Sequence, residues 1–557
     1  MKVPEKLYSH LTRRRANLRS IHSRVLPAYK QLRAFVYPFM GRFEGERPDE
    51  TQPNTDKQLK GTTNRCLRTL SAGMQAGLTS PSRDWFKLRS PSVLKGSADY
   101  EMKRWLESVH DIMLKIFADS NFYSETKRFY TELALYGTAA MTVLPDYDTV
   151  AYFHTLTAGS YYLGLGEKDK PEVFYRDFWL SAEQLEEQFG RDNLSAMVVS
   201  QLENAPDTQF QVCHSIERDT DPHARWKFRS VYWLLGGQKQ EVLSVGGFDS
   251  FPVLVARWDV LDGSIYGIGP GHIALSDVKQ LQVTVRDLNL AVKKEISPPL
   301  IGAAALKNSN LRTTPNGITF TDADDVSGGR LLAPLYPVNV DLSKLQTMIE
   351  DTKQEIRSAF FEDLFLMLHS NDDKSKTATE VDALELEKAM MLGPVLESLI
   401  SDFLNPLIDR VYQLMLNADI LPEAPESISA ADWEPEYISV LAQAQKLQSI
   451  KPVEQVLAYA GGLAGVKPEV LDNIDFDAAV RFYGETVGAP TGILRDPAEV
   501  AQIRQAAAEA AAAQQQAAQL QAVSEQLPNI ARGAELLAET DEGGNAALEQ
   551  LAAGGLV

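Results

Sequence analysis

The sequence predicts an α+β protein that is mainly helical. Residues 141–260 are rich in β-branched and aromatic residues between turn signals, which is typical of strands. Helical patterns precede this region and follow it, and one long helix among them covers residues 270–297. The 557 residues are enough for three or four domain-sized units with a large buried core.

The N-terminal part is predicted to consist of helices. Residues 1–46 are basic and compatible with a helix that Pro27 interrupts, residues 62–78 have core-spaced leucines, and residues 99–141 contain two more helices. The basic side chains are Arg13, Arg14, Arg15, Arg19, Arg24, Lys30 and Arg33. Such a run is either a nucleic-acid or partner-binding arm or, more commonly, a solvated helix face.

The strand-rich region is predicted to form a mixed α+β domain. The clearest strand segments are Tyr161-Tyr162-Leu163, Val173-Phe174-Tyr175-Arg176, Trp226-Lys227-Phe228 and Ser230-Val231-Tyr232-Trp233. A helix near Ala182 to Phe189 interrupts them.

A long helical hairpin is predicted after the strands. Pro270 suits the first turn of a helix that would extend about 40 Å and end at Ser297-Pro298-Pro299. A second helix follows from about Leu342 to Glu362, and the Gly-, Pro- and Asn-rich residues between the two would form a small β-like tip.

Three cations of the first long helix lie seven residues apart. Lys279, Arg286 and Lys293 therefore share one flank of that helix. They are either an ordinary charged face or a basic rail directed at a polyanion, and the pattern alone does not separate the two.

A capped helix follows a short polar loop that carries Lys374 and Lys376. Thr377 can cap its first turn and Glu380 can reach back to that cap. Gly393-Pro394 then bends or restarts the helix. An amphipathic run continues through Leu396, Leu399, Ile400, Phe403, Leu407, Val411 and Leu414.

The C-terminal part changes character after a Pro- and Glu-rich connector at residues 422–437. Helical segments are predicted at 438–448 and 452–464, and Asp496-Pro497 starts a helix whose residues 498–526 are mostly Ala and Gln. This helix is either part of a barrel built by several subunits or a flexible helical tail. Residues 540–557 are predicted to be disordered.

Bulk composition excludes several functional classes. The formal net charge of −20 argues against tight nucleic-acid binding by bulk electrostatics, although it suits a surface along which DNA slides. Apolar stretches are too short for a membrane span, and Met1-Lys2-Val3-Pro4-Glu5 lacks the apolar core of a secretory signal. Cys66 and Cys213 cannot form a disulfide framework, which is consistent with a reducing compartment.

Familiar catalytic motifs are missing from the sequence. It contains no phosphate-binding GxxxxGK[ST] loop, no HExxH and no GxSxG. Gly267-Ile268-Gly269-Pro270-Gly271-His272 has the wrong spacing for a dinucleotide loop, and Pro270 removes an N–H that would face phosphate. No histidine has a second ligand at metal spacing, and the adjacent Cys213-His214 pair is of a kind that is usually structural. The sequence therefore predicts neither an enzyme nor a metal or cofactor site.

Several ordered motifs together resemble one known family. They are Arg14-Arg15-Ala16, Tyr37-Pro38, Leu70-Ser71-Ala72-Gly73-Met74-Gln75-Ala76-Gly77-Leu78-Thr79-Ser80-Pro81-Ser82-Arg83-Asp84-Trp85-Phe86, Leu135-Tyr136-Gly137-Thr138-Ala139-Ala140, Phe251-Pro252, Ala256-Arg257-Trp258, Tyr266-Gly267-Ile268-Gly269-Pro270, Thr377-Ala378-Thr379-Glu380-Val381 and Gly393-Pro394-Val395-Leu396-Glu397. Over about residues 5–425 the chain resembles the head-to-tail connector, or portal, family of short-tailed bacteriophages. Ile268 departs from the pattern, because relatives often have an arginine after Tyr-Gly.

The resemblance implies a portal-type ring subunit, twelve of which form a ring. The implied segments are a wing of residues 1–269 (helical to about 140, then β-rich), a first stem helix of 270–297, a β-containing clip of 298–340, a second stem helix of 341–363, a channel loop of 364–376, wing helices of 377–435, a helical crown or barrel of 436–535 and a flexible tail of 536–557. The ring would sit at the capsid vertex of the virion, after assembly in the host cytoplasm.

The resemblance also implies partners and contact residues. Double-stranded DNA would pass the ring without being read in sequence. The other partners would be the major capsid protein, scaffolding protein, a terminase motor and a tail adaptor. Lys374, Lys376, Lys279, Arg286 and Lys293 would face the DNA. The clip residues Asn308, Asn310, Arg312 and Asn316 would contact the tail adaptor. The alternative is a homo-oligomeric helical scaffold or adaptor that does not contact DNA.

Overall fold

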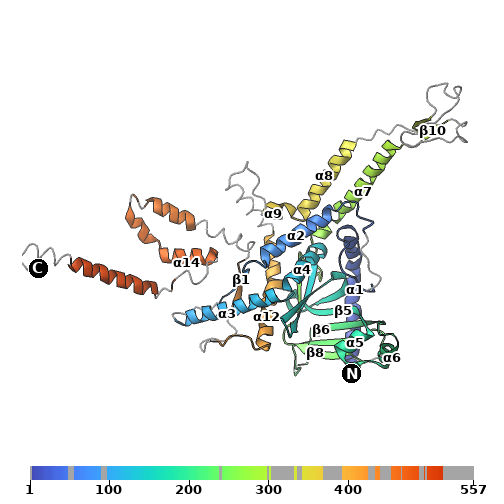
Figure 1. Cartoon of the computed structure of the whole chain (residues 1–557), viewed down its shortest axis with the longest axis horizontal. Helices are drawn as coiled ribbons and strands as arrows, with labels where there is room; N and C mark the ends of the chain where they lie inside the picture. Colours follow the sequence, from blue (N-terminus) through green and yellow to red (C-terminus); the bar gives the residue numbers. More distant parts are fainter. Residues whose placement is uncertain are drawn as a thin grey trace, which may run out of the picture. The chain divides into compact units, whose positions relative to one another are not determined.

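Helices and antiparallel sheets alternate along the chain, and the computed structural model divides it into two units, residues 1–449 and 450–557 (Figure 1). The structure describes residues 3–47, 55–89, 97–221, 223–237, 241–297, 300–302, 332–334, 342–367, 392–424, 433–438, 453–463, 465, 467–487, 495 and 499–517. None of the described helices combines the length and hydropathy that crossing a membrane requires.

Four helices make up most of the N-terminal part, as predicted. They are α1 (Glu5–Phe35), α2 (Thr62–Leu78), α3 (Ser97–Asp119) and α4 (Phe122–Tyr136). The expected interruption at Pro27 was wrong, because α1 is a single helix of 31 residues that contains this proline. Leu11, Leu18, Tyr29 and Leu32 of α1 are buried, so packing along one face holds the helix together across the proline.

The strand-rich region forms a five-stranded antiparallel sheet in the order β4-β5-β6-β7-β8. Its strands are β4 (Tyr161–Leu165), β5 (Pro171–Ser181), β6 (Gln209–Arg218), β7 (Phe228–Leu234) and β8 (Ser244–Phe248). The helix α5 (Ala182–Phe189) was predicted, and its capping box between Ser181 and Gln184 explains where it starts. The helix α6 (Ala196–Asn204) was not predicted.

A second sheet joins the strand region to the helices through closely packed glycines. Its order is β3-β2-β9, with β2 (Thr138–Asp146), β3 (Val150–Leu156) and β9 (Val253–Arg257). Gly137 ends α4 in the left-handed region at φ 69°, and a Cβ there would lie 2.5 Å from the carbonyl oxygen of Gly267. The glycines around residue 267 therefore allow the backbone there to approach the backbone of Gly137 closely. This close packing explains why the segment is rich in glycine.

Two long helices pack against each other after the sheets. Figure 1 shows α8 (Leu342–Ala359) returning beside α7 (Pro270–Ile296). The strands β10 (Leu300–Gly302) and β11 (Leu332–Pro334) pair antiparallel between the two helices in sequence. The second helix is shorter than predicted, because Phe361 at φ 53° separates α8 from α9 (Glu362–Met367).

The amphipathic run after Gly393-Pro394 is one nearly continuous helical stretch. It consists of α11 (Gly393–Leu399), a π-helical turn (Ile400–Leu404) and α12 (Asn405–Asn417). The chain then supplies β12 (Glu434–Tyr437), which pairs with β1 (Phe86–Arg89) from far upstream. The predicted helix start at Thr377 lies outside the described residues.

One large hydrophobic core connects most of the first unit. It includes Leu70 of α2, Phe129 of α4, Leu281 of α7, Ile356 of α8 and Phe403 of the π-helical turn. A smaller core lies between α1 and the five-stranded sheet and contains Leu18, Tyr162, Tyr175, Cys213 and Trp233. The five-stranded sheet also contributes Phe174, Ile216 and Phe228 to the large core, so it packs on the rest of the unit through both cores.

The second unit is helical in the residues described. It contains helical residues 453–463, the 3-10 turn Pro468–Asn473, α14 (Phe476–Val487) and the Ala-rich helical residues 499–517. A bidentate ion pair from Arg504 to Asp477, at 2.5 and 2.8 Å, joins the Ala-rich helix to α14. Both side chains are more than half exposed, so this pair contributes little stability.

Candidate functional site

The three predicted cations of α7 lie on one side of that helix. Arg286 is 65% exposed and its nearest carboxylate is the adjacent Asp287, at 3.8 Å. Lys293 is exposed as well. Lys279 differs, because its ammonium group donates a 2.6 Å hydrogen bond to Gln31 and lies 5.7 Å from the Phe35 ring of α1. Helix α1 therefore holds the first cation, while the second and third remain accessible.

Lys57 and Lys60, which the sequence analysis did not predict here, belong to a loop that lies beside this flank. Backbone N–H groups of Leu59 and Lys60 donate to the Gln282 amide oxygen at 2.7 and 3.1 Å, which fixes the preceding loop on α7. Lys57 of the same loop lies 5.4 Å from the Phe35 ring. Nothing in the local pattern of residues 47–60 indicates this placement, since a buried glutamine more than 200 residues away creates it.

Several of the basic residues of α1, among them Arg15 and Arg33, bind carboxylates of the same chain. Arg15 donates to both oxygens of Asp177, with Nε to Oδ1 at 2.9 Å, and the Asp177 side chain is fully buried. Arg33 binds Glu46 in the same bidentate way. The expectation of a nucleic-acid arm or a solvated face was therefore wrong for these residues, because they attach α1 to the rest of the unit.

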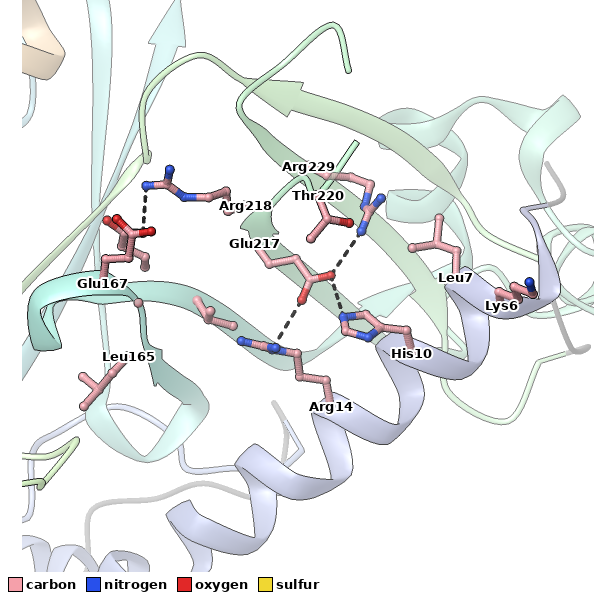
Figure 2. Close-up of a pocket in the computed structure, with 13 residues that line it drawn as sticks. Lys6, Leu7, His10, Arg14, Leu165, Glu167, Glu217, Arg218, Thr220 and Arg229 are labelled. Carbon is pink, nitrogen blue, oxygen red and sulfur yellow. Dashed lines mark hydrogen bonds and ion pairs between the residues drawn. The ribbon is translucent and has the colours of Figure 1, made fainter. Parts of the chain in front are cut away.

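A charged pocket of about 480 Å³ lies where α1 crosses the five-stranded sheet. Figure 2 shows Arg14, His10 and Arg229 converging on Glu217, at 3.5, 3.2 and 3.3 Å. The Tyr175 hydroxyl also donates to Glu217 at 3.0 Å. Burial and the Glu217 carboxylate raise the pKa of Tyr175 above its ordinary value. The phenol therefore remains a proton donor, and Glu217 acts as a clamp between α1 and the sheet.

The remaining wall of this pocket mixes both signs of charge. Arg218 donates to Glu172 at 3.1 Å, and Lys6 and Glu167 line the opening. Because the buried carboxylate is already neutralised by its own neighbours, the arrangement stabilises the fold and leaves no unpaired nucleophile beside a base.

The two cysteines lie in unreactive environments. Burial and the nearby Glu362 carboxylate raise the pKa of Cys66 to about 12, and burial raises the pKa of Cys213 well above its ordinary value. Cys213 and His214 are neighbours on β6, so their side chains point to opposite faces of the sheet. His214 stacks on Tyr232 at 3.8 Å, and burial lowers its pKa. The pair is structural.

The described part of the chain contains no group of three His, Cys, Asp or Glu residues that could hold a metal ion. The other predicted contact residues lie outside the described residues. These are Lys374, Lys376, Asn308, Asn310, Arg312 and Asn316.

In the sites above, charged side chains fix one element on another, and a long helix presents accessible cations. A family model described as "Bacteriophage head to tail connecting protein" matches residues 8–494. The chain belongs to this family. The resemblance found in its motifs is thereby confirmed.

Two proteins are similar over most of this chain. The "Probable portal protein" of Bordetella phage BPP-1 is 37% identical over 508 residues, which cover 90% of this chain and 91% of that protein. The "Portal protein" of Salmonella phage epsilon15 is 34% identical over 527 residues, which cover 93% of each chain. A chain from the neck of an empty gene transfer agent particle is 12% identical, covering 75% of this chain and 94% of that one, with a TM-score of 0.33.

Proposed function

We propose that this chain is a portal subunit. Twelve copies would form a ring at the capsid vertex of the virion, through which double-stranded DNA is packaged and ejected and to which the tail attaches. The observation that carries the proposal is the agreement of the family match over residues 8–494 with two similar proteins that are both named portal proteins. Each of those two covers at least 90% of this chain.

The ring would be a structural and not a catalytic component. A separate terminase motor would supply the work of packaging, and the major capsid protein, scaffolding protein and tail adaptor would be the other partners. The family match supports this role, because the matching model describes a head-to-tail connecting protein. An ATPase assay on purified protein should therefore give no turnover.

Contact with DNA is proposed for the loop that carries Lys374 and Lys376. Twelve copies of each would place a ring of positive charge around the duplex, which binds phosphate weakly and reads no sequence. The clip residues Asn308, Asn310, Arg312 and Asn316 are proposed to contact the tail adaptor. The wing, stem, clip and crown boundaries given above remain predictions.

Electron microscopy of the purified protein, combined with its mass in solution, tests the ring. Rings with a hole wide enough for a duplex and a mass near twelve chains are expected. A closed dimer or tetramer without a channel would refute the proposal. Replacing Lys374 and Lys376 by Ala distinguishes a portal from an adaptor that does not touch DNA. If the chain is a portal, the packaging or retention of DNA should change in this variant, and if it is such an adaptor, neither should change.

A further inference from the structure

Helix α7 exposes four large apolar side chains, which are Ile273, Val283, Leu290 and Ile296. Val283 and Leu290 are each 48% exposed, and because they are seven residues apart they point in the same direction. Val278, Leu281 and Val285 form the buried side of the same helix. Exposed apolar side chains that line up along a helix often mark a protein contact.

Accessible cations lie between and beyond these apolar residues. Arg286 is three residues after Val283 and four before Leu290, so it is a direct neighbour of both on the helix surface. Lys293 follows Leu290 by three residues and is exposed. The contact of Arg286 with Asp287 is exposed and long at 3.8 Å, so it does little to occupy the guanidinium group. We name Val283, Arg286, Leu290 and Lys293 the basic stripe.

Helix α8 carries a matching stripe of opposite charge. Met348 is 48% exposed, Asp351 follows it by three residues and Glu355 follows by four more, so all three share one side of the helix. Neither Asp351 nor Glu355 has an ion-pair partner among the residues that the structure describes. By contrast, Glu350 binds both Lys353 and Arg357, at 2.8 and 3.2 Å. We name Met348, Asp351 and Glu355 the acidic stripe.

The two stripes are not satisfied within one chain. Helices α7 and α8 pack on each other and bury Leu281 and Val285 of α7 and Ile349 and Ile356 of α8 in the common core. The basic and acidic stripes are exposed in the same pair of helices. The pair therefore has a basic, apolar surface on one helix and an acidic, apolar surface on the other.

We propose that the basic stripe of α7 contacts the acidic stripe of α8 in a second copy of this chain. The proposal rests on the ring proposed above and adds to it the residues and the polarity of one contact between subunits. A contact of α7 with α7 would bring Arg286 and Lys293 close to cations of the same kind, and a contact of α8 with α8 would do the same for the carboxylates. Only the contact of α7 with α8 pairs opposite charges, and such a head-to-tail contact is the type that closes a ring.

Two charge-reversed variants test the contact. One carries Arg286→Glu and Lys293→Glu, and the other carries Asp351→Lys and Glu355→Lys. Each alone places like charges in every contact, so we expect the protein concentration for half-assembly to rise roughly tenfold or more. A 1:1 mixture should restore rings, because alternating subunits then pair opposite charges at every contact.

The control reverses exposed charges elsewhere, with Lys115→Glu on α3 and Glu187→Lys on α5, and should assemble like the unaltered protein. Circular dichroism confirms that each variant is folded. The proposal is overturned if either reversed variant alone assembles normally, or if the mixture fails to restore rings. Normal rings with weaker DNA binding in the Arg286→Glu, Lys293→Glu variant would assign the basic stripe to DNA instead. Failure of the unaltered protein to form any ring would count against the proposed function itself.

Discussion

Replacing Arg15 by Met should loosen the attachment of α1 to the rest of the unit by a large amount. The substitution removes two charge-assisted hydrogen bonds from Asp177, whose side chain is fully buried, and leaves it the Tyr162 hydroxyl at 2.9 Å and the Cys213 thiol. Loss of one partner from a buried ion pair costs about 3–5 kcal/mol.

The loss of stability in Arg15→Met should therefore be about 3–5 kcal/mol.

Hydrogen exchange measured by mass spectrometry on α1 peptides reports this loss directly. After correction for intrinsic exchange rates, exchange should be roughly several hundredfold faster or more at pH 7. Arg13→Met is the matched control, because Arg13 is an exposed residue of the same helix. Arg15→Met with Asp177→Asn should recover most of the loss, since no unpaired charge remains. An acceleration below tenfold at pH 7 would refute the reasoning.

Three further predictions follow from the buried groups and the glycine junction. Burial raises the pKa of Glu132 to about 7, so the folded state holds a proton that the unfolded state releases between about pH 4.5 and 7. The free energy of unfolding therefore falls by up to about 3 kcal/mol as the pH rises through that window. Glu132→Gln should have a higher melting temperature than the unaltered protein at pH 8 but not at pH 5. Gly137→Ala should lower the melting temperature by several degrees, because φ is 69° and the new Cβ would meet the carbonyl oxygen of Gly267 at 2.5 Å; an unchanged melting curve would contradict this packing. Cys66, with a thiol pKa of about 12, should react with a thiol reagent at pH 8 only after denaturant is added, and rapid labelling of the native protein would show that the site is open.

Local sequence patterns predicted the elements better than the contacts. Helix α7 begins at Pro270 and ends at Ile296, as the proline and the apolar stripe indicated, because both signals act within a few residues. The partners of the basic residues could not be predicted in the same way. Asp177 is 162 residues from Arg15, and only the folded sheet brings the two together.

The same limit applies to the flank of α7. The spacing of Lys279, Arg286 and Lys293 correctly placed them on one side of the helix, but periodicity does not show that Gln31 binds the first of them. It also does not show that Gln282 fixes the loop of Lys57 beside that flank. Both facts depend on how α1 crosses α7, which is a tertiary property.

The pairing of β1 with β12 has a consequence for synthesis of the chain. Among the residues that the structure describes, Phe86–Arg89 pairs only with Glu434–Tyr437, in a sheet of two strands. During translation the upstream strand therefore has no partner until nearly 350 further residues have left the ribosome. Its unpaired backbone groups are an exposed edge for that whole interval. A chain that stops before residue 434 should thus aggregate even though its α1–α8 region is complete, whereas co-expression of the missing segment should rescue it.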